Sequence, residues 1–294
     1  MKVYGTQINS DIVLPLDLPT DTATRGVIDL IAHAPDELIQ SVGHASPFYF
    51  AHGRDVYLHS DCEHNQFKAG QTWCYEVKGV VRFYWLGGEP VIYYELDEKG
   101  TIELLAFWFI HLMLPLYFTL EDKYDFLHAG AVEVDGKPIL FIAPSMGGKS
   151  TMTDYFIRQG HTLISDDKVA TFSEDGQFML TGSHPYHRPY RKYEDLGYRV
   201  DHFIKIFKPI HTIYMLEAAD AEADIDISEV VGYKKFDALM PNYLFMFSHL
   251  KSQRLAYLAA MLNQIRLFQV TVPWEMERLG DVHDVITKNA KGLE

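Results

Sequence analysis

Residues 143–150 read Ala-Pro-Ser-Met-Gly-Gly-Lys-Ser, directly after the apolar run Ile-Leu-Phe-Ile at 139–142. The apolar run is typical of a buried strand, and the segment from Lys149 to Ile157 has a helical pattern. A strand, a turn of small residues and a helix N-terminus in this order indicate a phosphate-binding loop, because clustered backbone N–H groups and the helix N-terminus both favour an anion. In such a loop the lysine reaches the outer phosphates and the next hydroxyl holds magnesium. We therefore expect this segment to bind a nucleoside triphosphate.

The loop departs from the usual pattern at its first position, where Ala143 replaces a glycine. Pro144 restricts Ala143 to extended geometry. Gly147 and Gly148 are adjacent and can adopt positive φ at little cost, so we expect them to form the turn. The motif is short, and a chance Gly-Gly-Lys-Ser between a strand and a helix is the alternative. The expected nucleotide-binding residues are Ser145, Met146, Gly147, Gly148, Lys149, Ser150 and Thr151.

Composition limits the class of protein. The chain has 294 residues, of which 48% are hydrophobic, so it can form one large domain or two moderate ones with a sizeable core. The net charge of −14 argues against a general nucleic-acid binder or an anionic-membrane binder, since both need a cationic face. We therefore expect the protein to bind neither nucleic acid nor a membrane. The two cysteines, Cys62 and Cys74, lack the spacing of a zinc or redox pair.

Two segments bear on location in the cell. No apolar core follows Lys2, so the N-terminus does not resemble a signal peptide. The apolar run 104–118 is interrupted by His111 and Pro115 and is shorter than the ~20 residues that span a bilayer. We expect this run to be a buried helix and the protein to be soluble and cytoplasmic.

The chain divides by pattern into two regions, an expected β-rich N-terminal region at 1–122 and a second domain at 123–294. In the first, Thr101 is expected to cap an apolar helix near 101–120, and no motif indicates chemistry. In the second, expected strands and helices follow one another along the chain. The expected elements of the first region are strands at 47–51, 55–59, 72–77, 80–86 and 90–96. Those of the second are strands at 127–134, 139–142, 161–165 and 267–272, helices at 149–159, 236–247, 248–265 and 275–286, and an acidic loop at 218–228.

Asp166 and Asp167 end the expected strand 161–165. Magnesium bound to phosphates needs at least one carboxylate, and strand ends beside a phosphate loop line the same crevice. Neighbouring side chains on an extended segment point to opposite sides, so one carboxylate can face the metal while the other accepts the proton of an attacking hydroxyl. The alternative is that Asp-Asp-Lys simply starts a turn. His128, on the expected strand 127–134, is either close to the terminal phosphate or structural.

The segments 127–132, 143–150 and 158–167 occur in an order and spacing that resemble the HPr kinase/phosphorylase family. The catalytic domain of that family carries a histidine strand, a Gly-x-Ser-Gly-x-Gly-Lys-Ser/Thr loop and a Gly-His-x-Leu-x-x-Asp-Asp segment. The resemblance covers residues 125–182 well and 183–290 loosely. The first and fourth loop glycines of the family are Ala143 and Met146 here.

The resemblance implies a variant phosphate-loop α/β domain of the kind shared with phosphoenolpyruvate carboxykinase. The layout is similar to HPr-kinase-like proteins that pair a non-catalytic β-rich region with the kinase domain, some of which phosphorylate a lasso-peptide precursor on its C-terminal serine. Its implied roles are Asp166 as general base, His128 as an aid near the terminal phosphate, Lys149 on the phosphates, Ser150 and Asp167 on magnesium, and His187, Arg188 and Arg191 as charge-stabilising or substrate-contacting residues.

The expected function is that of an ATP-dependent serine kinase acting on a peptide or protein, with Mg²⁺. ATP is the default donor because the Asn-Lys-x-Asp guanine signature is absent. A nucleotide-binding regulator or scaffold without turnover and a small-molecule kinase remain as alternatives. The sequence leaves open the acceptor, whether the chain forms a homo-oligomer, and the role of residues 1–120.

Overall fold

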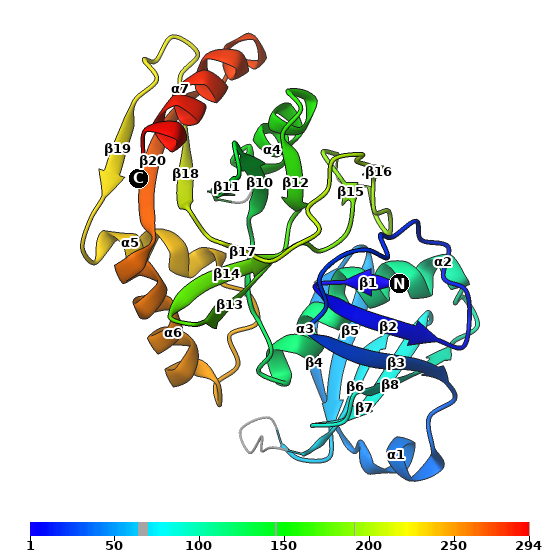
Figure 1. The fold of residues 1–294 in the computed structure, drawn as a ribbon. Helices are drawn as coiled ribbons and strands as arrows, with labels where there is room; N and C mark the ends of the chain where they lie inside the picture. The colour runs from blue at the N-terminus through cyan, green and yellow to red at the C-terminus, as the bar shows by residue number, and fades with distance from the viewer. Residues whose placement is uncertain (64–69, 145, 191, 294) are drawn as a thin grey trace. The chain divides into compact units, whose positions relative to one another are not determined.

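The computed structural model describes residues 1–63, 70–144, 146–190 and 192–293, and the fold is mixed α/β with several sheets (Figure 1). The chain divides into two compact units. Unit 1 comprises Met1–Lys123, Lys192–Leu196 and Phe247–His249. Unit 2 comprises Tyr124–Arg191, Gly197–Met246 and Leu250–Glu294. Two short later segments therefore belong with the N-terminal unit. A single boundary at 122/123 does not separate these two units.

Unit 1 is built on an eight-stranded sheet in the order β1-β2-β3-β8-β7-β6-β5-β4. The strands from β4 to β8 pair antiparallel with their neighbours. On its other side, β8 pairs in parallel with β3. One short helix, α1 (Asp36–Ser41), lies between β3 and β4. The strands are β1 (Lys2–Val3), β2 (Thr6–Ser10), β3 (Gly26–Ala32), β4 (His44–Ala51), β5 (Arg54–Ser60), β6 (Thr72–Val77), β7 (Val81–Leu86) and β8 (Val91–Leu96).

A long buried helical segment completes unit 1. It consists of α2 (Ile102–Trp108), the π-helical turn η1 (Phe109–Met113) and α3 (Leu114–Leu120). Thr101 caps it, since its Oγ1 accepts from the N–H of Leu104 at 3.3 Å. Pro115, two residues after the π-helical turn, has no N–H for the helical ladder.

The same segment, Ile102–Leu120, is long and apolar enough to cross a membrane, with a mean hydropathy of 1.6. However, 83% of an 18-residue window of this segment is buried inside the structure, as in the core helix of a soluble protein. Its aromatic rings pack on the sheet, with Phe109 6.0 Å from Phe83 and Tyr117 6.0 Å from Trp85 between ring centroids. The buried helix expected at this place is present.

Unit 2 is built on a six-stranded mixed sheet in the order β12-β10-β11-β18-β20-β19. The central strands β11, β18 and β20 are parallel, so their carboxyl ends meet at one edge, where ligands bind in open α/β sheets. The strands are β10 (Gly130–Val134), β11 (Lys137–Ile142), β12 (Thr162–Ser165), β18 (Thr212–Ala219), β19 (Ile227–Val230) and β20 (Arg266–Pro273).

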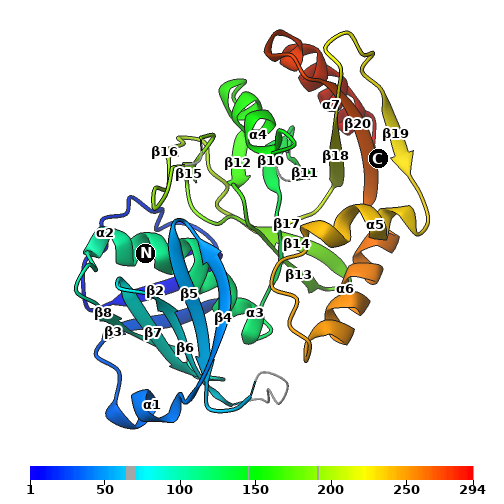
Figure 2. The same cartoon turned by 180° about the vertical axis from the view of Figure 1, so that it is seen from behind.

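Both faces of this sheet are covered (Figures 1 and 2). Along β11, Ile139 and Phe141 pack in a core with the helices α4 (Lys149–Arg158) and α7 (Leu279–Gly292). Leu140 and Ile142 face the other core, which includes α6 (Lys251–Gln264) and a four-stranded sheet in the order β17-β14-β13-β9. Alternate side chains therefore enter two different cores, which explains why β11 reads as a continuous apolar run. The smaller sheet consists of β9 (Asp125–Leu127), β13 (Val169–Glu174), β14 (Gln177–Thr181) and β17 (Lys208–Pro209).

Helix α4 approaches β10 closely at Gly130. A Cβ atom at this position would overlap the side-chain hydroxyl of Thr153 on α4. Only glycine leaves room for this contact, so Gly130 sets the distance between the loop helix and the sheet.

The structure corrects several expected elements in the second half. The expected helix 236–247 is only α5 (Lys234–Leu239) and the 3-10 turn η2 (Met240–Asn242), because Pro241 cannot continue the helical hydrogen bonds. The expected helix 275–286 begins with η3 (Met276–Arg278) and continues as α7 to Gly292. The expected acidic loop 218–228 is partly strand, since β18 extends into it and β19 pairs with β20.

Candidate active site

The loop between β11 and α4 turns through residues with positive φ. Gly148 precedes the helix with φ of 87°, and Met146 has φ of 63°. The positive-φ positions are therefore Met146 and Gly148, and not the expected pair Gly147 and Gly148. Gly147 is required for space instead, because a Cβ there would come within 2.9 Å of the Cβ of Ala143 and the carbonyl oxygen of Pro144. The expected Ser145 contact lies outside the described residues.

Lys149 begins α4, and its side chain folds back over the loop. Its Nζ donates to the carbonyl oxygen of Ala143 at 2.8 Å. The next turn of the helix is held by Thr153, whose hydroxyl donates to the carbonyl oxygen of Lys149 at 2.9 Å. These contacts hold the Lys149 ammonium group beside the loop, where it can face a bound phosphate.

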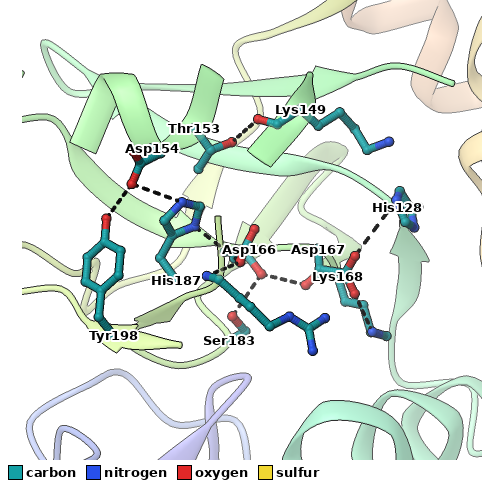
Figure 3. Close-up of polar contacts among 12 residues, drawn as sticks. His128, Lys149, Thr153, Asp154, Asp166, Asp167, Lys168, Ser183, His187 and Tyr198 are labelled. Atoms are coloured by element: carbon teal, nitrogen blue, oxygen red, sulfur yellow. Dashed lines mark hydrogen bonds and ion pairs between the residues drawn. The ribbon is translucent and has the colours of Figure 1, made fainter. Parts of the chain in front are cut away.

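The two aspartates follow the end of β12 and face different partners (Figure 3). Oδ2 of the buried Asp166 accepts from the backbone N–H of Arg188 at 2.8 Å. Oδ2 of Asp167 lies 2.6 Å from Nζ of Lys168, and its Oδ1 lies 3.8 Å from Nε2 of His128. The divergence was expected from an extended segment, but the cause is different. Asp167 has φ of 70°, so a left-handed residue turns the second carboxylate away from the first.

His128 lies where the chain changes sheets. The expected single strand 127–134 is in fact β9 in the small sheet and β10 in the large one, with His128 and Ala129 between them. The N–H of His128 donates to the carbonyl oxygen of Asn242 at 2.6 Å. The break places the imidazole at the junction of the sheets, opposite Asp167.

His187 is completely buried, with 0% exposure, in β15 (Tyr186–His187). Its Nδ1 lies 3.2 Å from Oδ2 of Asp166, and its Nε2 lies 3.5 Å from Oδ1 of Asp154 on α4. The sequence placed His187 among the residues that contact substrate or stabilise charge. His187 has no exposed surface, so it lies behind Asp166 and not on the cavity wall.

Further groups stabilise this arrangement. The hydroxyl of Tyr198 donates to Oδ1 of Asp154 at 2.6 Å, and Nε of Arg158 lies 2.8 Å from Oδ2 of Asp154. Burial, and then the hydrogen bond to Asp154, raise the pKa of Tyr198, so the phenol keeps the proton that it donates. Burial lowers the pKa of the nearby His184 to about 4, which keeps that imidazole neutral at pH 7.

One cavity of about 190 Å³ gathers most of the expected site. His128, both aspartates, Arg188 and the loop from Met146 to Thr151 line it. His187 lies behind the wall formed by Asp166, and Arg191 lies outside the described residues. The structure thus brings together residues that are up to 60 positions apart in the chain, as the positions of His128 and Arg188 show.

Sequence reasoning missed Trp274, which also lines this cavity. The residue follows β20, its N–H donates to the carbonyl oxygen of Ala219 at 2.9 Å, and its side chain is 60% exposed. A signal was available, since Trp274 follows the expected strand 267–272, and the carboxyl ends of parallel strands carry ligand sites.

The residues present are suitable for magnesium. Both expected ligands, Ser150 and Asp167, line the cavity. Within the described ranges, no group of three or more His, Cys, Asp or Glu side chains could hold a metal without help. Magnesium bound with a nucleotide usually takes one or two carboxylates together with phosphate oxygens and water, so a larger cluster is not required.

No protein-family model and no curated protein matches the chain. Among solved structures, the Hpr(Ser) kinase/phosphatase from Coxiella burnetii is similar over 56% of this chain and 97% of that chain. The identity is 14% and the TM-score is 0.35. This likeness is too distant to indicate the function of the chain.

Proposed function

We propose that this protein is an ATP-dependent kinase that transfers the terminal phosphate of ATP to a serine hydroxyl of a peptide or protein. The observation that carries the proposal is the single cavity that joins the loop 146–151 to Asp166, Asp167, His128 and Arg188. The motif order that resembles the HPr kinase/phosphorylase family points to the same chemistry.

In this proposal Asp166 is the general base. Its carboxylate lines the cavity while Oδ2 accepts from the N–H of Arg188, which fixes the direction of the side chain, and lies 3.2 Å from Nδ1 of His187. The acceptor oxygen bonds to the terminal phosphorus, the bond from that phosphorus to the bridging oxygen breaks, and ADP leaves. The proton of the hydroxyl passes to Asp166.

The cationic groups around the cavity stabilise the transferred phosphate. Lys149 and Arg188 bring permanent positive charge to the wall of the cavity, and His128 can add a hydrogen-bond donor. Magnesium, held by Ser150 and Asp167, would neutralise charge on the outer phosphates. The chain contributes mainly positioning and electrostatic stabilisation, as is usual for phosphoryl transfer.

The remaining parts of the proposal rest on the resemblance. The acceptor is a serine-bearing peptide or protein, residues 123–294 are the catalytic domain, residues 1–122 are a separate non-catalytic domain, and the protein acts in the cytoplasm. Oligomeric state is not part of the proposal.

The test is a transfer assay with the purified full chain, Mg²⁺, radiolabelled ATP and a library of peptides with internal or C-terminal serine. For Asp166→Asn we expect kcat to fall by about 10²- to 10⁴-fold while ATP affinity is retained. Asp175→Asn, at an exposed turn between β13 and β14, is the matched control and should keep full turnover.

The alternatives give different results. Full turnover by Asp166→Asn would show that another group is the base. Clear ATP binding without transfer to any acceptor would indicate a nucleotide-binding scaffold. Transfer to free serine or a sugar, but to no peptide, would indicate a small-molecule kinase.

A further inference from the structure

A second cavity, of about 150 Å³, adjoins the polar cavity. The two cavities share Gly147, Gly148, Thr151 and Trp274 on their walls. The second cavity contains none of the aspartates, His128 or Arg188. Glu275 lines it, but its walls are largely apolar side chains: Met152, Leu216, Val272, Met276 and Leu279. A small apolar cavity that opens directly onto a polar one is suited to a ligand with one apolar and one charged end.

Trp274 stands at the junction of the two cavities. Its indole ring is close to the loop, since a Cβ at Gly148 would lie 3.5 Å from the ring. The side chain is 60% exposed, whereas the other three tryptophans, Trp73, Trp85 and Trp108, are at most 3% exposed. A large exposed aromatic side chain at the mouth of a cavity is a common mark of a ligand-binding surface.

The position of Asp166 sets the direction in which a bound triphosphate would extend. The reacting phosphate must lie near Asp166, so the rest of the nucleotide extends away from the polar end. Thr151, the residue after Ser150, lines both cavities and therefore marks the path between them. A larger cavity of about 470 Å³ shares Met146, Gly147 and Trp274 with the polar cavity, but its walls include Ala218 and not Thr151.

We propose that the apolar cavity binds the nucleobase of the nucleoside triphosphate, with the indole of Trp274 stacked on the base. The inference rests on the proposed function, because it assumes that the phosphates occupy the loop 146–151. Stacking of a base on an aromatic side chain is sensitive to removal of the ring but tolerant of the identity of the base. The cavity therefore contributes affinity for ATP that a triphosphate without a base does not gain.

The test compares Mg–ATP with Mg–tripolyphosphate, both titrated into the full chain by calorimetry and by tryptophan fluorescence. We expect ATP to quench the fluorescence and tripolyphosphate to bind without quenching. Trp274→Ala should weaken ATP binding by about 5- to 150-fold and leave tripolyphosphate binding unchanged. Trp274→Phe should lose the quenching but keep most of the affinity, which separates stacking from a folding defect.

Two control variants test whether the effect is specific to Trp274 and to the apolar cavity. Tyr233→Ala removes another highly exposed aromatic side chain of unit 2 and should change neither ligand. Ala218→Leu narrows the larger neighbouring cavity and should leave ATP binding unchanged.

The outcomes separate the two proposals. Equal binding of ATP and tripolyphosphate, with no effect of Trp274→Ala, would overturn the nucleobase site but leave the phosphate site standing. Loss of ATP binding in Ala218→Leu would put the base in the larger cavity, which Trp274 also lines, and would overturn the inference. If neither ligand binds, the proposed function itself fails.

Discussion

Nδ1 of His187 lies 3.2 Å from Oδ2 of Asp166, and the histidine is buried between that carboxylate and Asp154 of helix α4 (Figure 3). One imidazole therefore lies between the proposed base and the helix that begins at Lys149. A carboxylate held in this way keeps its direction relative to the loop, which matters because small displacements of reacting groups reduce turnover strongly.

The first prediction concerns this connection. Asp154→Asn keeps the size of the side chain but removes the charge that faces His187. We expect kcat for phosphate transfer to fall by about 10- to 100-fold with KM for ATP within about threefold, since the variant disturbs the position of Asp166 and not the phosphate loop. Steady-state kinetics on Asp154→Asn and on the control Arg158→Gln would measure the changes in kcat and in KM. Arg158→Gln removes an exposed partner of Asp154 while Tyr198 remains, and is expected to have little effect. Equal losses in Asp154→Asn and Arg158→Gln would contradict a role through His187.

The second prediction concerns the contact between Gly130 and Thr153. Gly130→Ala forces a methyl group against the Thr153 hydroxyl, so we expect the free energy of unfolding to fall by about 1–3 kcal/mol. Thr153→Ala removes the obstructing oxygen, and the double variant should recover most of the loss that the first substitution causes. Denaturant unfolding of all four proteins gives the coupling energy. Additive effects would show that α4 can move away from β10 without strain.

The third prediction concerns Met146, which adopts φ of 63° with 81% of its surface exposed. Glycine tolerates this conformation better than any residue with a Cβ, and the exposed side chain contributes little packing. Met146→Gly is therefore expected to be more stable than Met146→Ala by about 1 kcal/mol, measured by denaturant unfolding. Comparing these two variants removes the effect of losing the methionine side chain. An alanine variant as stable as the glycine variant would show that the loop relaxes out of the left-handed conformation.

The fourth prediction concerns the pH dependence of stability. Burial lowers the pKa of His184 from 6.5 to about 4 in the folded protein. Between these values the unfolded chain binds the extra proton, so the folded state loses stability as the pH falls from about 6.5 to about 4, by up to about 3 kcal/mol. His184→Gln should lack this part of the pH dependence, which denaturant unfolding at several pH values would reveal. His161 and His211, whose pKa values burial also lowers, remain in both proteins and cancel from the comparison. Parallel curves for the two proteins would refute the assignment to His184.

Local sequence was sufficient to predict the strand, loop and helix at 139–158. The apolar run 139–142, the glycines and the start of a helix at Lys149 are adjacent in the chain, and each forms through contacts within a few residues. The same holds for Thr101 as a helix cap and for the strand before Asp166. The helices after residue 233 were predicted less well, because their ends depend on Pro241 and on packing against the sheet.

The sequence by itself determined an α/β chain with a strand–loop–helix at 139–158, a pair of aspartates at a strand end and a buried apolar helix. Only the tertiary structure decided which of these residues share a cavity, that His187 is buried behind Asp166, and that Trp274 stands beside the loop. The physical reason is that these relationships join strands and loops distant in the chain. Hydrophobic periodicity reports which face of an element is buried, but the pairing of β10, β11, β18 and β20 determines which side chains meet at the end of the sheet.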